Sequence, residues 1–260
     1  MDCFQAKKNS RRSLAALKPA KIDQATMNLS DYFGGSNRSK FCKMYIRQFN
    51  DRIEISVQRG DPFQRRPTIE DTTIRNLHFR PAGKDIVVLR KAEHVLQCNS
   101  SIKRAIPIYR RVFGILLFDV PDYFSDDEIF ALAPLEDLGE DALSWGDIDE
   151  IESIVFTKYR VDLGTQNAYK TFEADIIITY LRNCGKSLVI RGRLVDATFK
   201  IKFRGTKAWR TVKLYAGNAA CYTRDSNVFA AERWLMLRRF IIRSGAVVES
   251  EVNDETLASD

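Results

Sequence analysis

Alternating apolar and polar residues predict that most of the chain after residue 40 forms β-strands. Ile53, Ile55 and Val57 share one face of a segment whose intervening residues are polar, which is the period of a half-buried strand. Strand patterns recur at 85–89, 94–98, 159–163, 172–180, 188–203 and 208–215. The apolar stretch 106–120 is expected to be a buried strand that bends at Gly114. These patterns predict a mostly antiparallel β core.

Helical signals are confined to a few segments. Residues 227–243 contain no Pro or Gly, and their large apolar residues recur at helical spacing, which predicts a helix that packs on a sheet. Ser125, followed by Glu128 three residues later, has the spacing of a capping box. Short helices are therefore expected over 125–132 and around 147–153. The predicted fold class is α+β, with a mostly antiparallel β core and a C-terminal packed helix.

Composition shifts along the chain indicate its organisation. Residues 1–40 are poor in large apolar residues and rich in Lys and Arg, so we interpret them as a flexible, disordered basic arm. Residues 41–248 are expected to form a single β-rich domain, with an acidic helical insertion at about 119–153. Residues 249–260 form an acidic tail.

Charge is strongly segregated within this organisation. The chain has 41 Lys and Arg and 34 Asp and Glu, for a net charge of +7. Residues 112–157 contain 13 acids and no Lys or Arg, and the residues after Arg243 contain five acids and no base. The remaining segments are therefore strongly basic and should attract polyanions in a salt-dependent way. Alternatively, the acidic and basic segments neutralise each other within the fold, or the acidic segment covers a basic surface until an anionic partner displaces it.

The segment 200–213 is the most specific local feature. Gly205-Thr206 suits a two-residue hairpin turn, and counting outward from it places Lys200 opposite Thr211 and Lys202 opposite Trp209. One face then carries Lys and Arg around one indole, and a polyanion would relieve the repulsion between these like charges. Trp209 could stack on a base. Alternatively, this is a solvated face on which another element covers Trp209.

The candidate nucleic-acid-binding residues come from this hairpin, its flank and the arm. They are Lys200, Lys202, Arg204, Lys207, Trp209, Lys213, Arg191, Arg193, Lys7, Lys8, Arg11 and Arg12.

Signatures of catalysis, metal binding and cofactor binding are absent from the sequence. Gly185-Lys186-Ser187 is similar to the end of a phosphate-binding loop, but Tyr180 stands where that loop needs a Gly. The acidic clusters lack EF-hand spacing, and the five Cys residues include no CxxC pair. We therefore predict no catalytic residue, no metal and no cofactor.

These observations predict a non-enzymatic basic protein that binds RNA or single-stranded nucleic acid through phosphate contacts and aromatic stacking. Its organisation resembles that of virus-encoded structural or transport proteins, namely matrix, coat or movement proteins, although no family motif carries the resemblance. One alternative is a scaffold that binds an anionic membrane surface, associates with itself or binds a basic protein at the acidic segment. Another is a metal-dependent enzyme that acts on nucleic acid.

The expected location follows from the lack of long apolar runs. The longest uncharged, mostly apolar run spans 112–118, far short of the roughly 20 residues that a membrane-spanning helix needs. The first 21 residues contain no apolar stretch typical of a secretory signal. We therefore expect an intracellular protein of the cytoplasm or nucleus.

Overall fold

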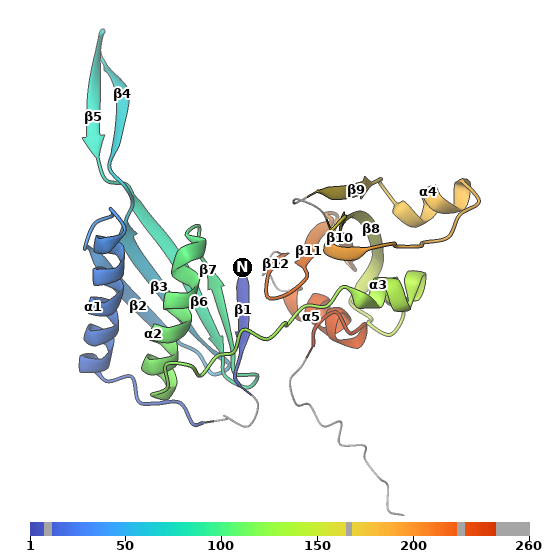
Figure 1. The fold of residues 1–260 in the computed structure, drawn as a ribbon, viewed down its shortest axis with the longest axis horizontal. Coiled ribbons are helices and arrows are strands. Elements are labelled where there is room, and N and C mark those ends of the chain that lie inside the picture. Colours follow the sequence, from blue (N-terminus) through green and yellow to red (C-terminus); the bar gives the residue numbers. More distant parts are fainter. Residues whose placement is uncertain (8–11, 165–167, 223–226, 243–260) are drawn as a thin grey trace, which may run out of the picture.

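The computed structural model describes residues 1–7, 12–164, 168–222 and 227–242. These residues form two five-stranded antiparallel sheets and one two-stranded ribbon, and helices pack against the sheets (Figure 1). We call the first sheet with its helices the first lobe and the second sheet with its helices the second lobe. The α+β class and the mostly antiparallel β content are confirmed.

The first lobe contains a sheet in the order β1-β7-β6-β3-β2. Its elements are β1 (Asp2–Gln5), α1 (Pro19–Gly35), β2 (Cys42–Gln48), β3 (Arg52–Gly60), β6 (Ala82–Arg90), β7 (Val95–Asn99), the 3-10 turn η1 (Lys103–Ala105) and α2 (Ile106–Phe118). Helices α1 and α2 lie side by side over one face of the sheet (Figure 1). Ile53, Ile55 and Val57 of β3 are buried beneath them, as the alternation predicts.

The segment expected as a buried strand over 106–120 is helix α2 instead. Tyr109, Phe113 and Leu116 are buried in the first lobe, and their spacing of three and four residues is helical. Such an apolar run satisfies a buried strand and a buried helix equally well. Gly114 is needed because a Cβ there would lie 2.5 Å from the carbonyl oxygen of Val120, where the chain folds back after the helix.

The expectation of a disordered arm over 1–40 is wrong for the residues of β1 and α1. Strand β1 pairs with β7 at the edge of the first sheet. Helix α1 buries Ala25, Leu29 and Phe33, which are spaced four residues apart and form one narrow stripe. A helix that covers a sheet needs only such a stripe, and this is why a segment with few large apolar residues still folds.

A two-stranded ribbon, β4 (Gln64–Glu70) and β5 (Thr73–Phe79), continues the hairpin of β3 and β6 beyond the sheet. It projects away from the rest of the first lobe (Figure 1). Residues 61–63 lie outside the strands and connect β3 to β4.

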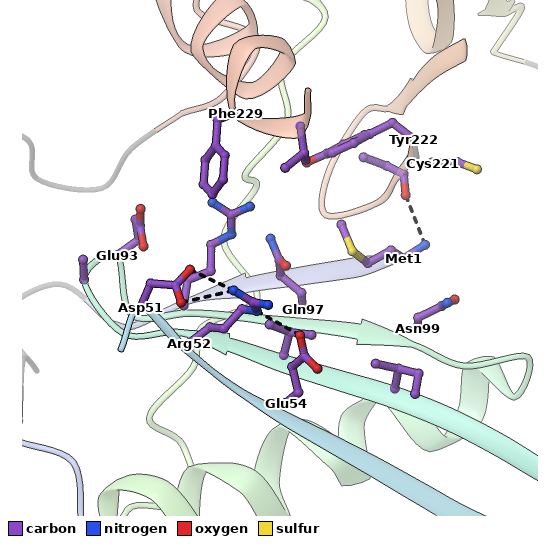
Figure 2. A pocket seen from close by; sticks show the side chains of 16 residues that line it. Met1, Asp51, Arg52, Glu54, Glu93, Gln97, Asn99, Cys221, Tyr222 and Phe229 are labelled. Atoms are coloured by element: carbon purple, nitrogen blue, oxygen red, sulfur yellow. Dashed lines mark hydrogen bonds and ion pairs between the residues drawn. The ribbon is translucent and has the colours of Figure 1, made fainter. Parts of the chain in front are cut away.

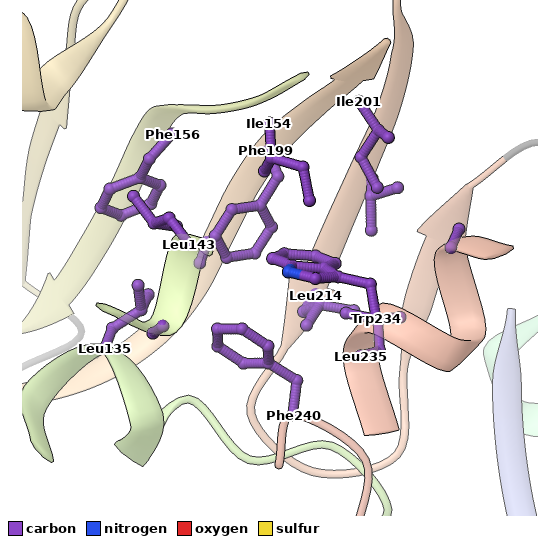
Figure 3. Close-up of a cluster of buried hydrophobic side chains, with 14 of the residues drawn as sticks. Leu135, Leu143, Ile154, Phe156, Phe199, Ile201, Leu214, Trp234, Leu235 and Phe240 are labelled. Atoms are coloured by element: carbon purple, nitrogen blue, oxygen red, sulfur yellow. The ribbon is translucent and has the colours of Figure 1, made fainter. Parts of the chain in front are cut away.

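The second lobe contains a sheet in the order β12-β11-β10-β8-β9. Its elements are α3 (Ala133–Asp137), the 3-10 turn η2 (Gly139–Leu143), β8 (Ile151–Asp162), β9 (Tyr169–Glu173), α4 (Ile177–Asn183), β10 (Arg193–Phe203), β11 (Arg210–Tyr215), β12 (Ala220–Tyr222) and α5 (Val228–Leu237). Rings fill the space between the sheet and α5 (Figure 3). Phe199 lies 5.2 Å from Trp234 and 5.4 Å from Phe240, measured between ring centroids.

The C-terminal helix packs on a sheet as predicted, but it is shorter than expected. Helix α5 ends at Leu237, and Arg239 takes a left-handed conformation with φ of 61°. The chain thereby turns Phe240 back into the core that already holds Trp234. The strand expected over 172–180 ends at Glu173 and is followed by α4.

The acidic segment folds differently from the expectation. Residues 125–132 form no helix; the backbone N–H and the hydroxyl of Ser125 both donate to the carbonyl of Gln5 and tie this segment to β1. The helix expected around 147–153 is also wrong, since β8 begins at Ile151. The helices within 119–153 are α3 and η2.

The buried residues fall into two clusters, one in each lobe, whereas a single domain was expected. Strand β1 links them, since Cys3 packs in the second lobe and the adjacent Phe4 packs in the first. Side chains alternate between the two faces of a strand, so β1 serves both cores. The expected acidic tail, 249–260, lies outside the described residues.

Candidate nucleic-acid interface

The hairpin of β10 and β11 has the register that the sequence predicts. Thr198 stands opposite Lys213, Phe199 opposite Val212 and Lys200 opposite Thr211. Phe199 and Val212 point into the second lobe, so the other pairs face outward. The alternation therefore gives the predicted apolar and basic faces.

The turn of this hairpin is longer than predicted. Strand β10 ends at Phe203 and β11 begins at Arg210, so residues 204–209 form the connection. Gly205 takes a left-handed conformation with φ of 76°, and the N–H and hydroxyl of Thr206 donate to the carbonyl of Phe203. The expected pair of Lys202 with Trp209 is not part of the ladder, which ends at Ile201 and Arg210.

The outward side of the second sheet carries basic residues from three strands. We call this surface the basic face, and we include the hairpin connection in it. Its basic side chains are Lys158, Arg160, Lys200, Lys202, Arg204, Lys207 and Lys213. The strand residues Lys158 and Arg160 were missed as candidates. Their alternation along the sequence places them on one face of β8, but only the pairing of β8 with β10 places that face beside Lys200.

Two of the candidate residues have carboxylate partners within the fold. Lys202 forms an ion pair with Glu152 of β8, 2.5 Å apart. Lys213 lies 3.5 Å from the carboxylate of Asp196, which is also 2.7 Å from Arg160. Both carboxylates lie outside residues 198–213, so acids elsewhere in the fold relieve the charges of Lys202 and Lys213.

Three other candidates make no ion pair with any residue that the structure describes. Lys200, Arg204 and Lys207 are exposed, and the direct neighbours of Lys200 on the two adjacent strands are Thr211 and Val155. Trp209 is 42% exposed. The alternative that another element covers this indole is therefore wrong. The hairpin and its connection thus present three cations that have no ion-pair partner among the described residues, together with an exposed aromatic ring.

The remaining candidates lie elsewhere. Arg193 begins β10 at the end opposite to Phe203, about 30 Å away for a strand of this length, and Arg191 precedes it. Lys7 and Arg12 belong to the first lobe, where their backbone N–H groups donate to the carbonyl and the hydroxyl of Tyr123. Lys8 and Arg11 lie outside the described residues. The structure therefore does not gather the twelve candidates into one surface.

The acidic segment supplies counter-charges to distant parts of the fold. Its ion pairs within the described residues are Asp119 with Lys21, Asp126 with Arg110, Glu140 with Arg182, Asp147 with Arg238 and Glu152 with Lys202. The hydrogen bond from Arg238 lowers the pKa of the Asp147 carboxyl. The acidic and basic segments therefore neutralise each other in part, and Glu152 is the residue of the acidic segment that forms an ion pair with the basic face.

Among the described residues, no three His, Cys, Asp or Glu side chains come close enough together to hold a metal ion. No helix in the same part of the chain is both long enough and apolar enough to cross a membrane. Comparison with protein-family models and with curated protein sequences finds no significant match.

Proposed function

We propose that this chain is a non-enzymatic protein that binds RNA or single-stranded nucleic acid on its basic face. One observation on the hairpin of β10 and β11 carries the proposal. Lys200, Arg204 and Lys207 have no carboxylate partner among the described residues, and Trp209 is exposed. Cations neutralise phosphates and release counterions, while an aromatic ring stacks on bases of any sequence. Together these groups suit a flexible strand.

The paired residues of the basic face would support such binding. Exposed ion pairs contribute at most about 1 kcal/mol, so a phosphate can replace the carboxylate of Glu152 beside Lys202 at small cost. The basic face would then extend from the hairpin connection towards β8. Glu152 would act as a weak competitor of the nucleic acid.

We also propose that the protein belongs to the virus-encoded structural or transport class and acts in the cytoplasm or nucleus. Genome binding is the activity that the resemblance implies. Because β1 and α1 occupy part of residues 1–40, this proposal relies on the basic face and not on a mobile arm.

Fluorescence anisotropy with a labelled single-stranded RNA at several salt concentrations tests the proposal. The full chain should bind at low salt and release the RNA as salt rises. A triple variant with Lys200→Gln, Arg204→Gln and Lys207→Gln should bind more weakly. The slope of log K against log salt should also fall by about 2, or about 0.7 for each lost phosphate contact.

A matched control removes the same charge from the sheet of the first lobe, through Lys43→Gln, Arg47→Gln and Lys84→Gln. These side chains are also exposed, so net charge changes equally in both variants. The proposal requires a clearly larger loss of affinity and slope for the hairpin variant. Equal losses, or no binding by the unmodified chain at low salt, would contradict it.

A further inference from the structure

A cleft lies between the second lobe and the face of the first sheet that points away from α1 and α2. Its volume is about 650 Å³. Ile86 and Val88 of β6 line it from the first sheet, and Phe229 of α5 lines it from the second lobe (Figure 2). A neighbouring hollow of about 320 Å³ shares part of this lining, namely Arg90, Ala92, Glu93, Gln97, Tyr222 and Phe229. The two hollows therefore adjoin along these residues.

Gln97 of β7 places a buried hydrogen-bond acceptor at this cleft. Its neighbours Leu96 and Cys98 are buried in the core of the first lobe, so strand alternation directs Gln97 to the opposite face, towards the second lobe (Figure 2). The side chain is 5% exposed, and its amide oxygen Oε1 has no hydrogen-bond partner among the described residues. Because a buried acceptor without a donor costs free energy, a ligand with an N–H group would satisfy it.

The charged groups that line the cleft leave one carboxylate unpaired. Both guanidinium groups already have carboxylate partners, which are Asp51 and Glu54 for Arg52, and Glu232 for Arg90. The fourth carboxylate, that of Glu93, lines both hollows and forms no ion pair with any residue that the structure describes. The lining therefore carries an excess of negative charge, which raises the local concentration of cations and disfavours anions.

Aromatic side chains of the second lobe give the cleft an apolar wall. Phe229 lines both hollows and is 63% exposed, so its ring has surface that a ligand would cover. The ring of Tyr222 is held beside it, because the Tyr222 hydroxyl donates to the carboxylate of Glu232 at 2.9 Å. The cleft thus combines apolar walls with a few polar groups, as small-molecule sites do.

We propose that the cleft binds a small organic cation with an apolar body. Its ammonium or amidinium group donates to Oε1 of Gln97, and the carboxylate of Glu93 in the same cleft balances its charge. Its apolar body packs between the first sheet and Phe229. A hydrocarbon without a donor would leave Gln97 unsatisfied, and an anion would meet the excess of carboxylates while both guanidinium groups are already paired.

Saturation-transfer NMR titrations of the nuclease-treated full chain with tryptamine test this proposal. Tryptamine joins an apolar indole to an ammonium group, and indolepropionate carries a carboxylate in place of that ammonium. Tryptamine should bind at millimolar concentration or below. It should also raise the midpoint temperature of unfolding, because a ligand of the folded state stabilises that state.

Two variants with matched controls locate the bound tryptamine. Gln97→Leu removes the acceptor at similar size, so tryptamine should bind about tenfold more weakly. Its control is Gln58→Leu, because Gln58 of β3 lies on the same face of the first sheet but outside the cleft. Glu93→Gln should weaken tryptamine severalfold. Glu70→Gln makes the same change of net charge on the ribbon of β4 and β5 and should leave the affinity unchanged.

Indolepropionate shows whether the cleft selects a cation. This anion can bind to the basic face, so Gln97→Leu should leave its affinity unchanged, and an equal loss for both probes would overturn the proposal. No binding of tryptamine at millimolar concentration, or equal affinities of Gln97→Leu and Gln58→Leu for it, would also overturn it. If Gln97→Leu does not fold, equal affinities of Glu93→Gln and Glu70→Gln for tryptamine decide in the same way. None of these outcomes depends on RNA binding.

Discussion

Arg59 and Asp85 form an ion pair in the core of the first lobe, with 2.7 Å between the guanidinium Nε and the carboxylate Oδ2. Both side chains are 1% exposed. Tyr109 donates its hydroxyl to the same carboxylate at 2.6 Å, and burial raises the pKa of that hydroxyl well above its ordinary value. A buried network of this kind stabilises the fold only while every member has its partner.

The first prediction concerns this network. Asp85→Ala leaves the Arg59 guanidinium buried beside fewer acceptors, so the free energy of unfolding should fall by about 3–5 kcal/mol. Glu54→Ala is the control, because its pair with Arg52 is partly exposed and should contribute at most about 1 kcal/mol. Urea unfolding measures both losses. Equal losses in the two variants would contradict a larger contribution of the buried ion pair to the free energy of unfolding.

The second prediction concerns cysteine reactivity. Burial, with a smaller contribution from Asp85, raises the pKa of the Cys42 thiol to about 11, whereas Cys184 and Cys221 are exposed. An alkylating reagent at a pH near 9 should therefore modify Cys184 and Cys221 first, since the thiolate is the reactive form. Peptide mass spectrometry over time reads out each site. Modification of Cys42 as fast as that of Cys184 would contradict the described environment.

The raised pKa of Cys42 also affects stability at high pH. The folded chain holds this proton more tightly than the unfolded chain does. This difference in the pKa of Cys42 therefore stabilises the folded chain fully below about pH 9, and the stabilisation is lost as pH rises towards 11. In urea unfolding, Cys42→Ser should reduce the fall in the free energy of unfolding between about pH 9 and pH 11. An unchanged fall in this variant would contradict a role of Cys42 in it.

The third prediction uses the ion pair between Glu152 and Lys202. Glu152→Gln frees Lys202 and removes one negative charge from the basic face, so RNA affinity should rise severalfold at low salt. Glu70→Gln makes the same change of net charge on the ribbon, where Glu70 pairs with Arg75. Anisotropy titrations should show little effect of Glu70→Gln. Equal gains from both variants would mean that only net charge matters.

The fourth prediction concerns the exposed indole. Trp209→Ala should weaken single-stranded ligands by about 1–3 kcal/mol, because one base loses its stacking partner. Duplex binding should change less, since paired bases are not available to stack on the ring. The control is Tyr180→Ala on α4, whose ring is 51% exposed. Similar losses of affinity for single strands and duplexes would contradict stacking of Trp209 on a base.

The strands and the hairpin register could be predicted because they depend on residues that are close together in the sequence. Alternation fixes which residues of β3 and β10 face a core, and counting outward from Gly205 fixes the pairing of Lys200 with Thr211. The same reasoning failed for α2, where nearly every residue of the run is apolar and the period carries little information. It also failed for α1, whose apolar stripe is too narrow to stand out in a basic segment.

Whether a given Lys or Arg forms an ion pair could not be predicted, because its carboxylate partner is distant in sequence. Glu152 and Lys202 are 50 residues apart and meet only because β8 pairs with β10. Lys200, on the same strand and face as Lys202, lies between Val155 and Thr211 and has no such partner among the described residues. Sequence therefore identified a basic surface, and the structure shows which of its cations are unneutralised.

Photo-crosslinking of a single-stranded RNA to the full chain, followed by mass spectrometry of the crosslinked peptides, locates the RNA on the protein. Crosslinks should concentrate on residues 200–213, with Trp209 the most frequent site, and should decrease as salt rises. Crosslinks confined to the first lobe would contradict nucleic-acid binding on the basic face.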